Sequence, residues 1–565
     1  MTDKRKIVVI GLDGAVWSLL KPKMDKGYMP NLKRLADGGA TGNLESIYPP
    51  ETPAAWPSFM TGKNPGKVGA FDFLVYDPVT KTEHPVSAKR RKGTTLWKYL
   101  TDAGKTSLVL NVPTTYPVEP IQGAMISDFL TPEDARDYAH PVELVEELEA
   151  KYGHYPLFFK TMSFVAANSE RNCEAFLDEC EWMDKTKFEV AEELFDRYDP
   201  DFTMIHIWGT DRLQHELWNL FDPEHPRYDA KIAAKYGERI EAYYTMLDDC
   251  MGRLIDKAGE DCISFVISDH GFGPTHFFID LNSWLLREGF IVLKDSLRVK
   301  VKKFLWDLGW SPLNVTNLLQ PLFKFAALFK TPSPHATIRK ATGALAIPGM
   351  LDLNKDVDWE RTKAYAPFGW SGIYINTRDI RPHGSVDPAD YDAIRDDIVK
   401  RWDAVVNPYT GEKVGGPVHT NDTMYHGEFA QYGPDVMPLP LENKHMPVCF
   451  FGFTSKDPVY KNSTLFGNHV MDGILCAHGK GIEPGAYQDA ILYDIAPTVL
   501  HLLGLPVPDD MDGKVIEGIL TEEERAKGPV KTTHHEEAAT SGSADALTAE
   551  EEAELRDKLK GLGYL

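Results

Sequence analysis

Aspartate and histidine residues, which supply oxygen and nitrogen ligands to divalent metals, directly follow several predicted strands of this sequence. Asp13 comes after a short apolar strand predicted at residues 6–11, and Asp269 and His270 lie at the end of a buried strand predicted at 262–268. In a parallel sheet the carboxyl ends of the strands form the edge where ligands bind. Asp13 alone would suit a simple turn equally well. The adjacent Asp-His pair at a strand end favours a functional site.

A second Asp-His pair, Asp211 and His215, lies just past another predicted strand. A spacing of four residues puts both side chains on one face of a helix, and a carboxylate with an imidazole suits a zinc-type cation. Taken alone, such a pair is more often a surface ion pair. Nearer the carboxyl terminus, His469 precedes a strand predicted at 474–477 and His478 follows it. The residues alone leave open which of these two histidines completes a metal site.

Thr52 stands immediately before Pro53, a sequence typical of a helix N-cap followed by proline at the first helical position. A hydroxyl at the start of a helix is also well placed for a nucleophile, because the helix dipole stabilises arriving negative charge. At neutral pH it needs a base or a metal to activate it. The three aspartates and three of the four histidines suffice for two three-ligand sites with Thr52 between them. This set predicts a two-metal phosphoryl-transfer centre.

The elements that must position these residues alternate between strands and helices through the first half of the chain. Further strands are predicted at 107–111 and 201–208, and long helices at 172–198 and 228–257. Strands separated by such helices predict a parallel sheet covered on both faces. We therefore expect an α/β fold of three layers, α/β/α, with a mostly parallel central sheet and an inserted helical cap.

The chain is predicted to divide into four parts. Residues 1–296 form the first part of a catalytic α/β core, and 351–521 form its remainder, with an irregular insertion near 407–434 that is rich in Gly, Pro, Asn and Thr. Residues 297–350 form the helical cap. Residues 522–565 form an acidic flexible linker that ends in a short helix, because this stretch is polar and poor in apolar residues.

The segment 297–331 at the start of the cap is amphipathic, with basic residues concentrated at its beginning. It suits a cap folded over the main domain, a partner surface or a helix on a membrane surface. The cap is the favoured interpretation, and membrane contact through this segment is not favoured. No run of the sequence approaches the ~18 apolar residues that a membrane span requires.

The overall composition excludes several classes of protein. The 565 residues are 43% hydrophobic and 26% charged, so a large core can form. The 61 basic and 84 acidic side chains give a net charge of −23, which repels a nucleic-acid polymer. A small phosphorylated substrate remains compatible where a metal reverses the local field. The oligomeric state is left open.

The cysteines and the amino terminus bear on the compartment. Six scattered cysteines without CxxC spacing argue against a thiolate zinc cluster and suit a reducing environment. The start, MTDKRKIVVIGLDG, has fewer apolar residues than the about 7–15 of a signal peptide. We therefore expect a cytoplasmic protein.

Six segments, in this order, resemble the alkaline phosphatase superfamily and, within it, the type I phosphodiesterase/nucleotide pyrophosphatase branch. They span nearly the whole predicted catalytic core. The segments are VVIGLDG (8–14), PPETPAAWPSFMTGKNPG (49–66), GTDRLQHELW (209–218), SDHGFGP (268–274), GNHVMDGILCAHGKGI (467–482) and DIAPTVLHLLGLPVPDDMDG (494–513). The segments at 211–218 and 281–284 look most like the prokaryotic phosphohydrolase/phosphomutase-like group of this superfamily.

The resemblance implies two divalent metal ions, Zn²⁺ or alternatively Mn²⁺, and a covalent phosphothreonine intermediate on Thr52. One metal would lie among Asp13, Thr52, Asp269 and His270. The other would be held by Asp211, His215 and His469. His469 is chosen over His478 because the superfamily's third histidine follows a Gly-Xaa pair shortly before the strand.

A nucleophilic threonine is, within the superfamily, typical of phosphodiesterases. The resemblance therefore implies a metal-dependent hydrolase of phosphodiester or pyrophosphate bonds. A phosphomonoesterase or a metal-dependent phosphomutase of the same fold is the alternative, and a non-catalytic, metal-stabilised binding protein is the alternative from another class. Candidate substrate contacts are Lys63, Phe73, Arg212 and His478.

Overall fold

A nine-stranded sheet forms the centre of the molecule. The computed structural model describes residues 5–159, 170–315, 318, 349–367, 372–449, 452–462, 466–535 and 547–562. The strands lie in the order β20 (Gly485–Ile491), β2 (Ala40–Glu45), β19 (Asp472–His478), β9 (Ile263–Ile267), β1 (Ile7–Leu12), β8 (Phe202–Ile207), β5 (Ser107–Leu110), β6 (Gly123–Ile126) and β7 (Ala139–His140).

The direction of these strands decides which residues meet at each edge of the sheet. β9, β1, β8, β5 and β6 run parallel to one another, and β2 and β20 also form a parallel pair. β19 is antiparallel to both of its neighbours, β9 and β2, and β7 is antiparallel to β6. The prediction of a mostly parallel sheet is confirmed.

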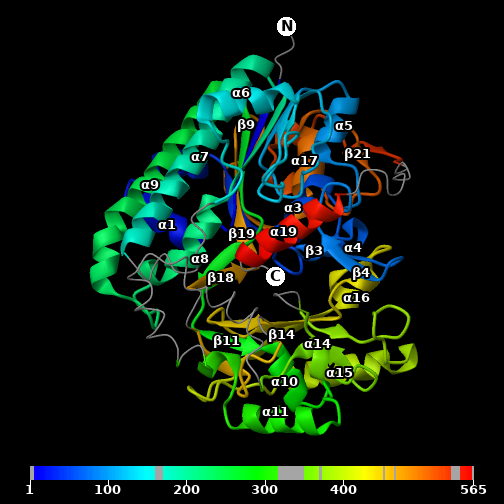
Figure 1. The fold of residues 1–565 in the computed structure, drawn as a ribbon. Helices are drawn as coiled ribbons and strands as arrows, with labels where there is room; N and C mark the ends of the chain where they lie inside the picture. Colours follow the sequence, from blue (N-terminus) through cyan, green and yellow to red (C-terminus); the bar gives the residue numbers. More distant parts are fainter. Residues whose placement is uncertain are drawn as a thin grey trace.

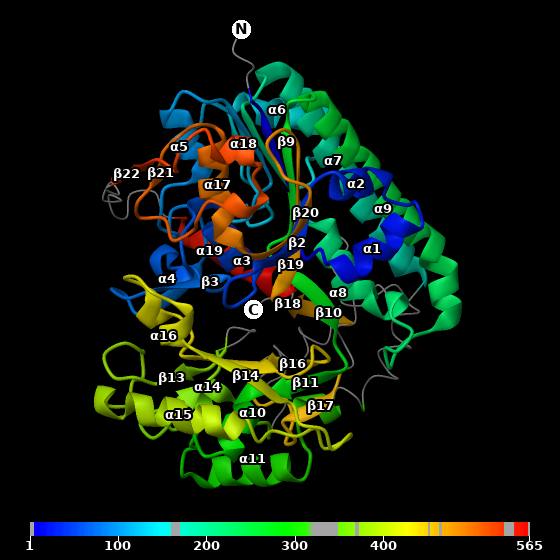
Figure 2. The same ribbon diagram turned by 180° about the vertical axis from the view of Figure 1, so that it is seen from behind.

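Helices cover both faces of the sheet, as Figures 1 and 2 show. One face carries α1 (Trp17–Asp25), α2 (Pro30–Asp37), α6 (Glu143–Tyr152), α7 (Glu170–Tyr198) and α9 (Ala230–Ala258). The other carries α3 (Thr52–Thr61), α5 (Leu96–Asp102) and α17 (Ile495–Leu502).

Alternate residues of β1 serve two different cores. Val8 and Ile10 pack into the core under the long helices, whereas Ile7 and Val9 pack into the core under α3 and α17. A strand that is buried on both faces must be apolar at every position, which explains the unbroken run IVVIGL. The predicted three-layer α/β/α architecture is confirmed.

A second body lies beside the sheet, below it in Figure 1. Its own hydrophobic core runs from Ile279 to Val459, and no strand described between residues 277 and 461 joins the central sheet. Its strands are β11 (Phe277–Asp280), β12 (Ala364–Tyr365), β13 (Tyr374–Ile375), β14 (Gly415–Thr420), β15 (Val436–Pro440), β16 (His445–Val448) and β17 (Val459–Lys461). Its helices include α10 (Leu281–Arg287), α11 (Leu297–Asp307), α14 (Leu353–Asp356), α15 (Tyr391–Trp402) and α16 (Asn421–Met424).

The predicted cap at 297–350 falls within this second body, but most of residues 316–348 lie outside the described part of the chain. The predicted irregular insertion at 407–434 holds β14 and α16 and belongs to the same body. We therefore propose that the whole second body, and not the 297–350 segment alone, forms the cap. The division of the chain into domains stays a prediction.

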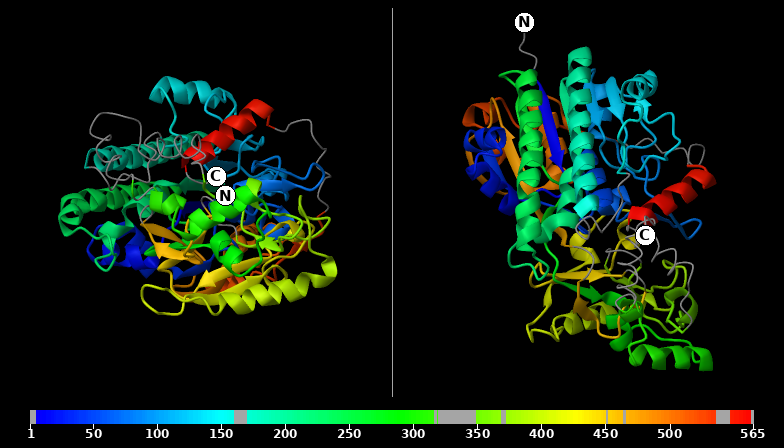
Figure 3. Two further views of the ribbon diagram at one scale, coloured as in Figure 1. Left: turned by 60° about the horizontal axis from the view of Figure 1, so that its bottom comes forward. Right: turned by 60° about the vertical axis from the view of Figure 1, so that its left-hand side comes forward.

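The described part of the predicted linker at 522–565, residues 522–535 and 547–562, contains two helices and a short strand. α18 (Glu522–Arg525) and β22 (Thr532–Thr533), which pairs with β21 (Val507–Pro508), follow directly on the core. α19 (Ala549–Leu562), the red helix in Figure 3, then packs on the part of the molecule that holds the central sheet. Its Leu555 and Leu559 are buried, and its Glu552 accepts a hydrogen bond from Arg90 at 2.6 Å.

All six cysteines are buried and free, as small apolar residues of a core. Within the described ranges, no helix combines the length and the apolar character that crossing a membrane requires.

Candidate functional site

Three strand ends bring the predicted residues together at one edge of the central sheet. Asp13 follows β1, and Asp269 and His270 follow β9. α8 (Gly209–Phe221) begins just after β8 and carries Asp211 and His215 on its inner face. Because β1, β8 and β9 run parallel, these three ends meet. All five side chains are buried.

The antiparallel direction of β19 decides between the two candidate histidines. Its start lies at the same edge as Asp269, and β18 (Gly467–Val470), just before it, pairs with β10 (Gly271–Pro274) so that His469 stands opposite Phe272. Its end lies at the other edge, where His478 stands opposite Ser264 at the beginning of β9. His469 therefore joins the cluster. The predicted substrate contact at His478 is wrong, because that residue lies across the sheet.

Asp211, His215 and His469 form one group that could hold a metal ion. Asp211 Oδ1 lies 3.3 Å from His215 Nε2 and 3.2 Å from His469 Nε2. The other ring nitrogens face backbone carbonyl oxygens, with His215 Nδ1 3.0 Å from Gly467 O and His469 Nδ1 2.9 Å from Pro50 O. These contacts orient both rings so that each Nε2 points at Asp211, as outer-sphere partners of metal ligands do.

Asp13, Asp211 and His270 form a second such group, which shares Asp211 with the first. His270 Nε2 lies 3.5 Å from Asp13 Oδ1 and 3.4 Å from Asp269 Oδ2. The same nitrogen lies 3.4 Å from Thr52 Oγ1. The hydroxyl of Thr52 therefore stands directly beside the carboxylates of the cluster.

The start of α3 differs by one residue from the prediction and thereby leaves the threonine hydroxyl available. Glu51, in extended conformation, is the N-cap, and its carbonyl accepts hydrogen bonds from Ala54 and Ala55 at 2.9 and 2.8 Å. Thr52 is instead the first helical residue, and its hydroxyl contacts His270. The helix ends after Thr61 at the C-cap Gly62, whose φ of 68° is left-handed.

Two buried carboxylate oxygens test whether the cluster suits a cation. Asp13 Oδ1 and Asp269 Oδ2 accept no hydrogen bond from any residue in the described part of the chain. A buried oxygen without a partner costs free energy. Since carboxylate oxygens and imidazole nitrogens are the donors that zinc takes in tetrahedral sites, the residues fit a divalent metal.

The pKa values show the same crowding of charge. Burial raises the pKa of Asp13 well above its usual value, and the nearby Asp269 and Asp211 raise it further. Burial also raises the pKa of Asp269 to about 7. At Asp211 the effect of burial is outweighed by His215 and His469, which hold the pKa well below its usual value. A divalent cation would favour the ionised form of all three carboxylates.

His206 and Trp56 contact Asp13, and the sequence alone did not identify either of them as its partner. His206 Nε2 lies 2.7 Å from Asp13 Oδ2, and Trp56 Nε1 donates to the same oxygen at 3.4 Å. Trp56 can approach because Gly11 has no side chain; a Cβ there would lie 2.4 Å from the indole. His206 sits inside a buried strand, where nothing in the sequence distinguishes it from a core residue.

Three of the predicted substrate contacts have structural partners instead. Lys63, at the far end of α3 from Thr52, pairs with Asp510 at 2.6 Å. Phe73 is buried in the core under the long helices. Arg212 is buried and pairs with Glu216, one turn along α8, at 3.3 Å. All three side chains are buried, and their role as substrate contacts stays a prediction.

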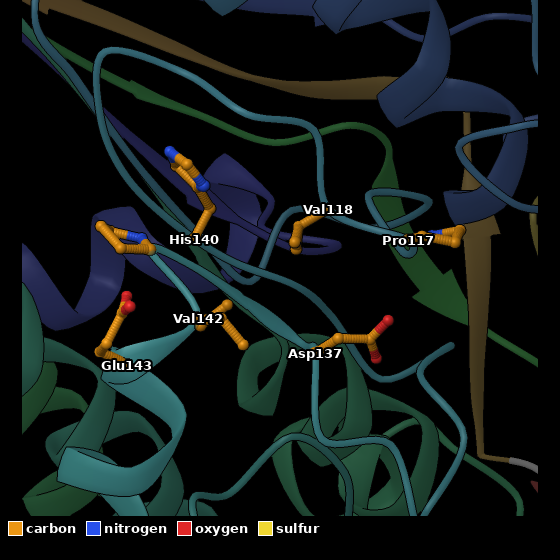
Figure 4. A pocket seen from close by; sticks show the side chains of 8 residues that line it. Pro117, Val118, Asp137, His140, Val142 and Glu143 are labelled. Carbon is orange, nitrogen blue, oxygen red and sulfur yellow. The ribbon is translucent and has the colours of Figure 1, made fainter.

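A pocket of about 280 Å³ opens beside the cluster, between the two bodies. Glu51 and His469 line it on the side of the sheet, and Leu439, Asn443 and other residues of the second body line the opposite side. A larger hollow of about 370 Å³ at the β7 edge, shown in Figure 4, is lined by none of the candidate residues. Of these two, the pocket beside His469 is therefore the one that adjoins the cluster, and Glu51, the residue directly before Thr52, lines it.

Comparison with known proteins decides the family. Residues 7–439 match the sequence profile of the family described as type I phosphodiesterase / nucleotide pyrophosphatase. The chain belongs to this family. The resemblance noted in the sequence is confirmed, and the protein is a phosphoester hydrolase. No curated protein matches the chain at a significant level.

Solved structures share the fold. Phosphonoacetate hydrolase from Sinorhizobium meliloti, in complex with phosphonoacetate, is 14% identical, with a TM-score of 0.53 and coverage of 88% of this chain and 96% of that one. The wild-type alkaline phosphatase PafA is also 14% identical, with a TM-score of 0.50 and coverage of 92% and 99%. The predicted alkaline-phosphatase-like fold is confirmed.

Proposed function

We propose that this hydrolase cleaves phosphodiester or pyrophosphate bonds of small phosphorylated molecules through a covalent intermediate on Thr52, with two divalent metal ions, Zn²⁺ in the first place, at the Asp-His cluster. The observation that carries the proposal is the position of one nitrogen. His270 Nε2 lies within 3.5 Å of Thr52 Oγ1, Asp13 Oδ1 and Asp269 Oδ2 alike. The hydroxyl and the carboxylates thus converge on one small space.

The residues divide into two ligand sets. Asp211, His215 and His469 would hold one ion, and Asp13, Asp269 and His270 would hold the other, beside Thr52. Zn²⁺ suits the mixed oxygen and nitrogen donors, and Mn²⁺ is the alternative. When bound, such ions supply positive charge that lowers the pKa of a hydroxyl or a water and offsets the charge of the transferring phosphoryl group.

The chain's own residues then account for a two-step reaction. Thr52 Oγ forms a bond to phosphorus, its proton passes to solvent, and the bond to the leaving oxygen breaks with its electron pair, after which that oxygen takes a proton. A water then adds to phosphorus, the bond to Thr52 breaks, and the hydroxyl regains its proton. The first turn of α3, where Thr52 lies, favours the negative charge of the phosphoryl oxygens.

The preference for diesters can be tested with two chromogenic esters. We expect the zinc-loaded enzyme to turn over bis-p-nitrophenyl phosphate with a kcat/KM at least about tenfold above that for p-nitrophenyl phosphate, a difference of about 1.4 kcal/mol in activation free energy. Faster turnover of the monoester would overturn the preference and favour the phosphomonoesterase. Transfer of the phosphoryl group within a sugar phosphate, without release of phosphate, would favour a phosphomutase.

His206 should act as a positioning residue for Asp13. Replacing it by phenylalanine removes the group 2.7 Å from Asp13 Oδ2, and loss of such an outer-sphere partner costs about 10–100-fold in metal affinity or activity. The metal dissociation constant, measured by competition with a chelator, should rise by that factor. His206→Gln, whose amide can still donate, should recover most of the affinity. Equal metal affinity in wild type and His206→Phe would refute the role.

The six buried, free cysteines suit a reducing environment. On this ground we propose a cytoplasmic location. Fractionation of the source cells would test it, since recovery of the enzyme outside the cytoplasm would contradict the proposal.

A further inference from the structure

Exposed apolar side chains gather on one short stretch of the second body. Thirteen large hydrophobic residues are exposed among the described residues, and six of them fall between residues 297 and 318. These six are Leu297, Val301, Phe304, Leu308, Trp310 and Leu318. Apolar residues scattered singly over a surface need no explanation, but a continuous patch marks an interaction site.

Four of the six lie on one face of α11 and just past its end. Leu297, Val301, Phe304 and Leu308 follow one another at intervals of four, three and four residues, which places them in a single stripe. They are 80%, 50%, 62% and 68% exposed. A helix on the surface of a globular protein normally turns such a stripe toward the core. Here the stripe faces outward.

The opposite face of α11 already attaches the helix to the second body. Val299 and Trp306 are buried in its core, and Lys302 pairs with Asp356 at 2.6 Å. α11 therefore packs on the second body through this buried face, and the exposed stripe is a separate apolar face. α11 lies at the end of the second body farthest from the central sheet, at the bottom of Figures 1 and 2.

Basic side chains border the stripe. Lys294, Arg298 and Lys300 are exposed, and Lys303 is half-buried. Lys300 pairs with Asp295 at 2.6 Å and Lys303 with Asp307 at 2.7 Å, but exposed pairs of this kind contribute little and exchange readily. In a chain of net charge −23, four basic residues against two acidic ones make this a locally positive end.

We propose that α11 is an interfacial helix that binds an anionic phospholipid surface, with Leu297, Val301, Phe304 and Leu308 entering the headgroup layer and the neighbouring basic residues contacting lipid phosphates and carboxylates. A helix in the membrane plane has this combination of an apolar stripe and flanking Lys and Arg. A second copy of the chain fits less well. A symmetric contact through α11 would bring Arg298 and Lys300 of one copy against the same residues of the other.

Vesicle binding by the full-length protein tests the proposal. The protein is mixed with phosphatidylcholine vesicles, either pure or containing about 30% phosphatidylserine, and co-sedimentation is measured. We expect at least about tenfold tighter binding to the anionic vesicles, because each basic residue near such a surface contributes about 1 kcal/mol. The variant Phe304→Glu/Leu308→Glu should lower this binding by about tenfold or more, since it places charge in the stripe.

A matched variant controls for the added charge. Val79→Glu/Val142→Glu alters two exposed apolar residues elsewhere, 89% and 53% exposed, and should bind as the wild type does. Both variants should keep the wild-type thermal midpoint and its turnover of a soluble diester, because neither touches the Asp-His cluster. The proposal fails if the wild-type protein does not bind anionic vesicles, or if Phe304→Glu/Leu308→Glu binds them equally well. It also fails if light scattering shows a dimer that this variant dissociates, since the stripe would then be a subunit contact.

Discussion

Replacing Thr52 by alanine should abolish turnover while leaving the metal content unchanged. The substitution removes the atom proposed to attack phosphorus in the first step, and loss of a nucleophile of this kind costs on the order of 10⁴-fold or more in kcat. The metal content should persist because the Asp and His donors of both groups remain. Steady-state kinetics and elemental analysis of the same preparation measure the two quantities together.

Two variants make the Thr52 result specific. Thr61→Ala removes a buried hydroxyl from the same helix, one that donates to Pro57 O at 2.7 Å. It should leave kcat within about threefold of wild type, because Thr61 does not belong to the Asp-His cluster. This variant controls for the effect on the fold of losing a buried hydroxyl. Thr52→Ser keeps a hydroxyl and should retain measurable turnover. Rapidly quenched wild-type enzyme should carry the substrate's phosphoryl group on the peptide that contains Thr52. Thr52→Ala with turnover within tenfold of wild type would place the nucleophile elsewhere.

Replacing Asp211 by alanine should have the second large effect, because this carboxylate belongs to both candidate metal groups. We expect the metal content to fall from about two ions per chain to one or fewer, and kcat to fall on the order of 10³-fold. The Nε2 atoms of His215 and His469, 3.0 Å from each other, would also lose the carboxylate that lies within 3.3 Å of both.

Metal removal and a surface control complete the Asp211 test. Chelation of the wild-type enzyme should abolish turnover, and titration with Zn²⁺ should restore it at about two ions per chain. Asp261→Ala, which changes an exposed aspartate paired with Lys480 at 3.0 Å, should keep the wild-type metal content. If Asp211→Ala binds two ions and turns over normally, the shared carboxylate is not a ligand, and the cluster needs another assignment.

The sequence by itself determined the local elements and the residues that could do chemistry. The unbroken apolar run of β1 and the hydrophobic periodicity of the long helices α7 and α9 are local patterns that can be read from the sequence of one chain. Asp13 and Asp269 could be selected because they directly follow predicted strands, and because the carboxyl ends of parallel strands share one edge. The parallel direction of most of the strands was predictable because long helices separate them in the sequence.

The tertiary structure alone decided matters that depend on contacts between distant parts of the chain. His469 and His478 flank the same strand, and only the antiparallel pairing of β19 with β9 places the first at the cluster and the second across the sheet. His206 became visible as a partner of Asp13 only through the pairing of β8 with β1. Lys63 proved to be an ion-pair partner because Asp510, 447 residues away, folds against it. Strand direction, register and the burial of a side chain arise from non-local hydrogen bonds and packing, which no short stretch of sequence contains.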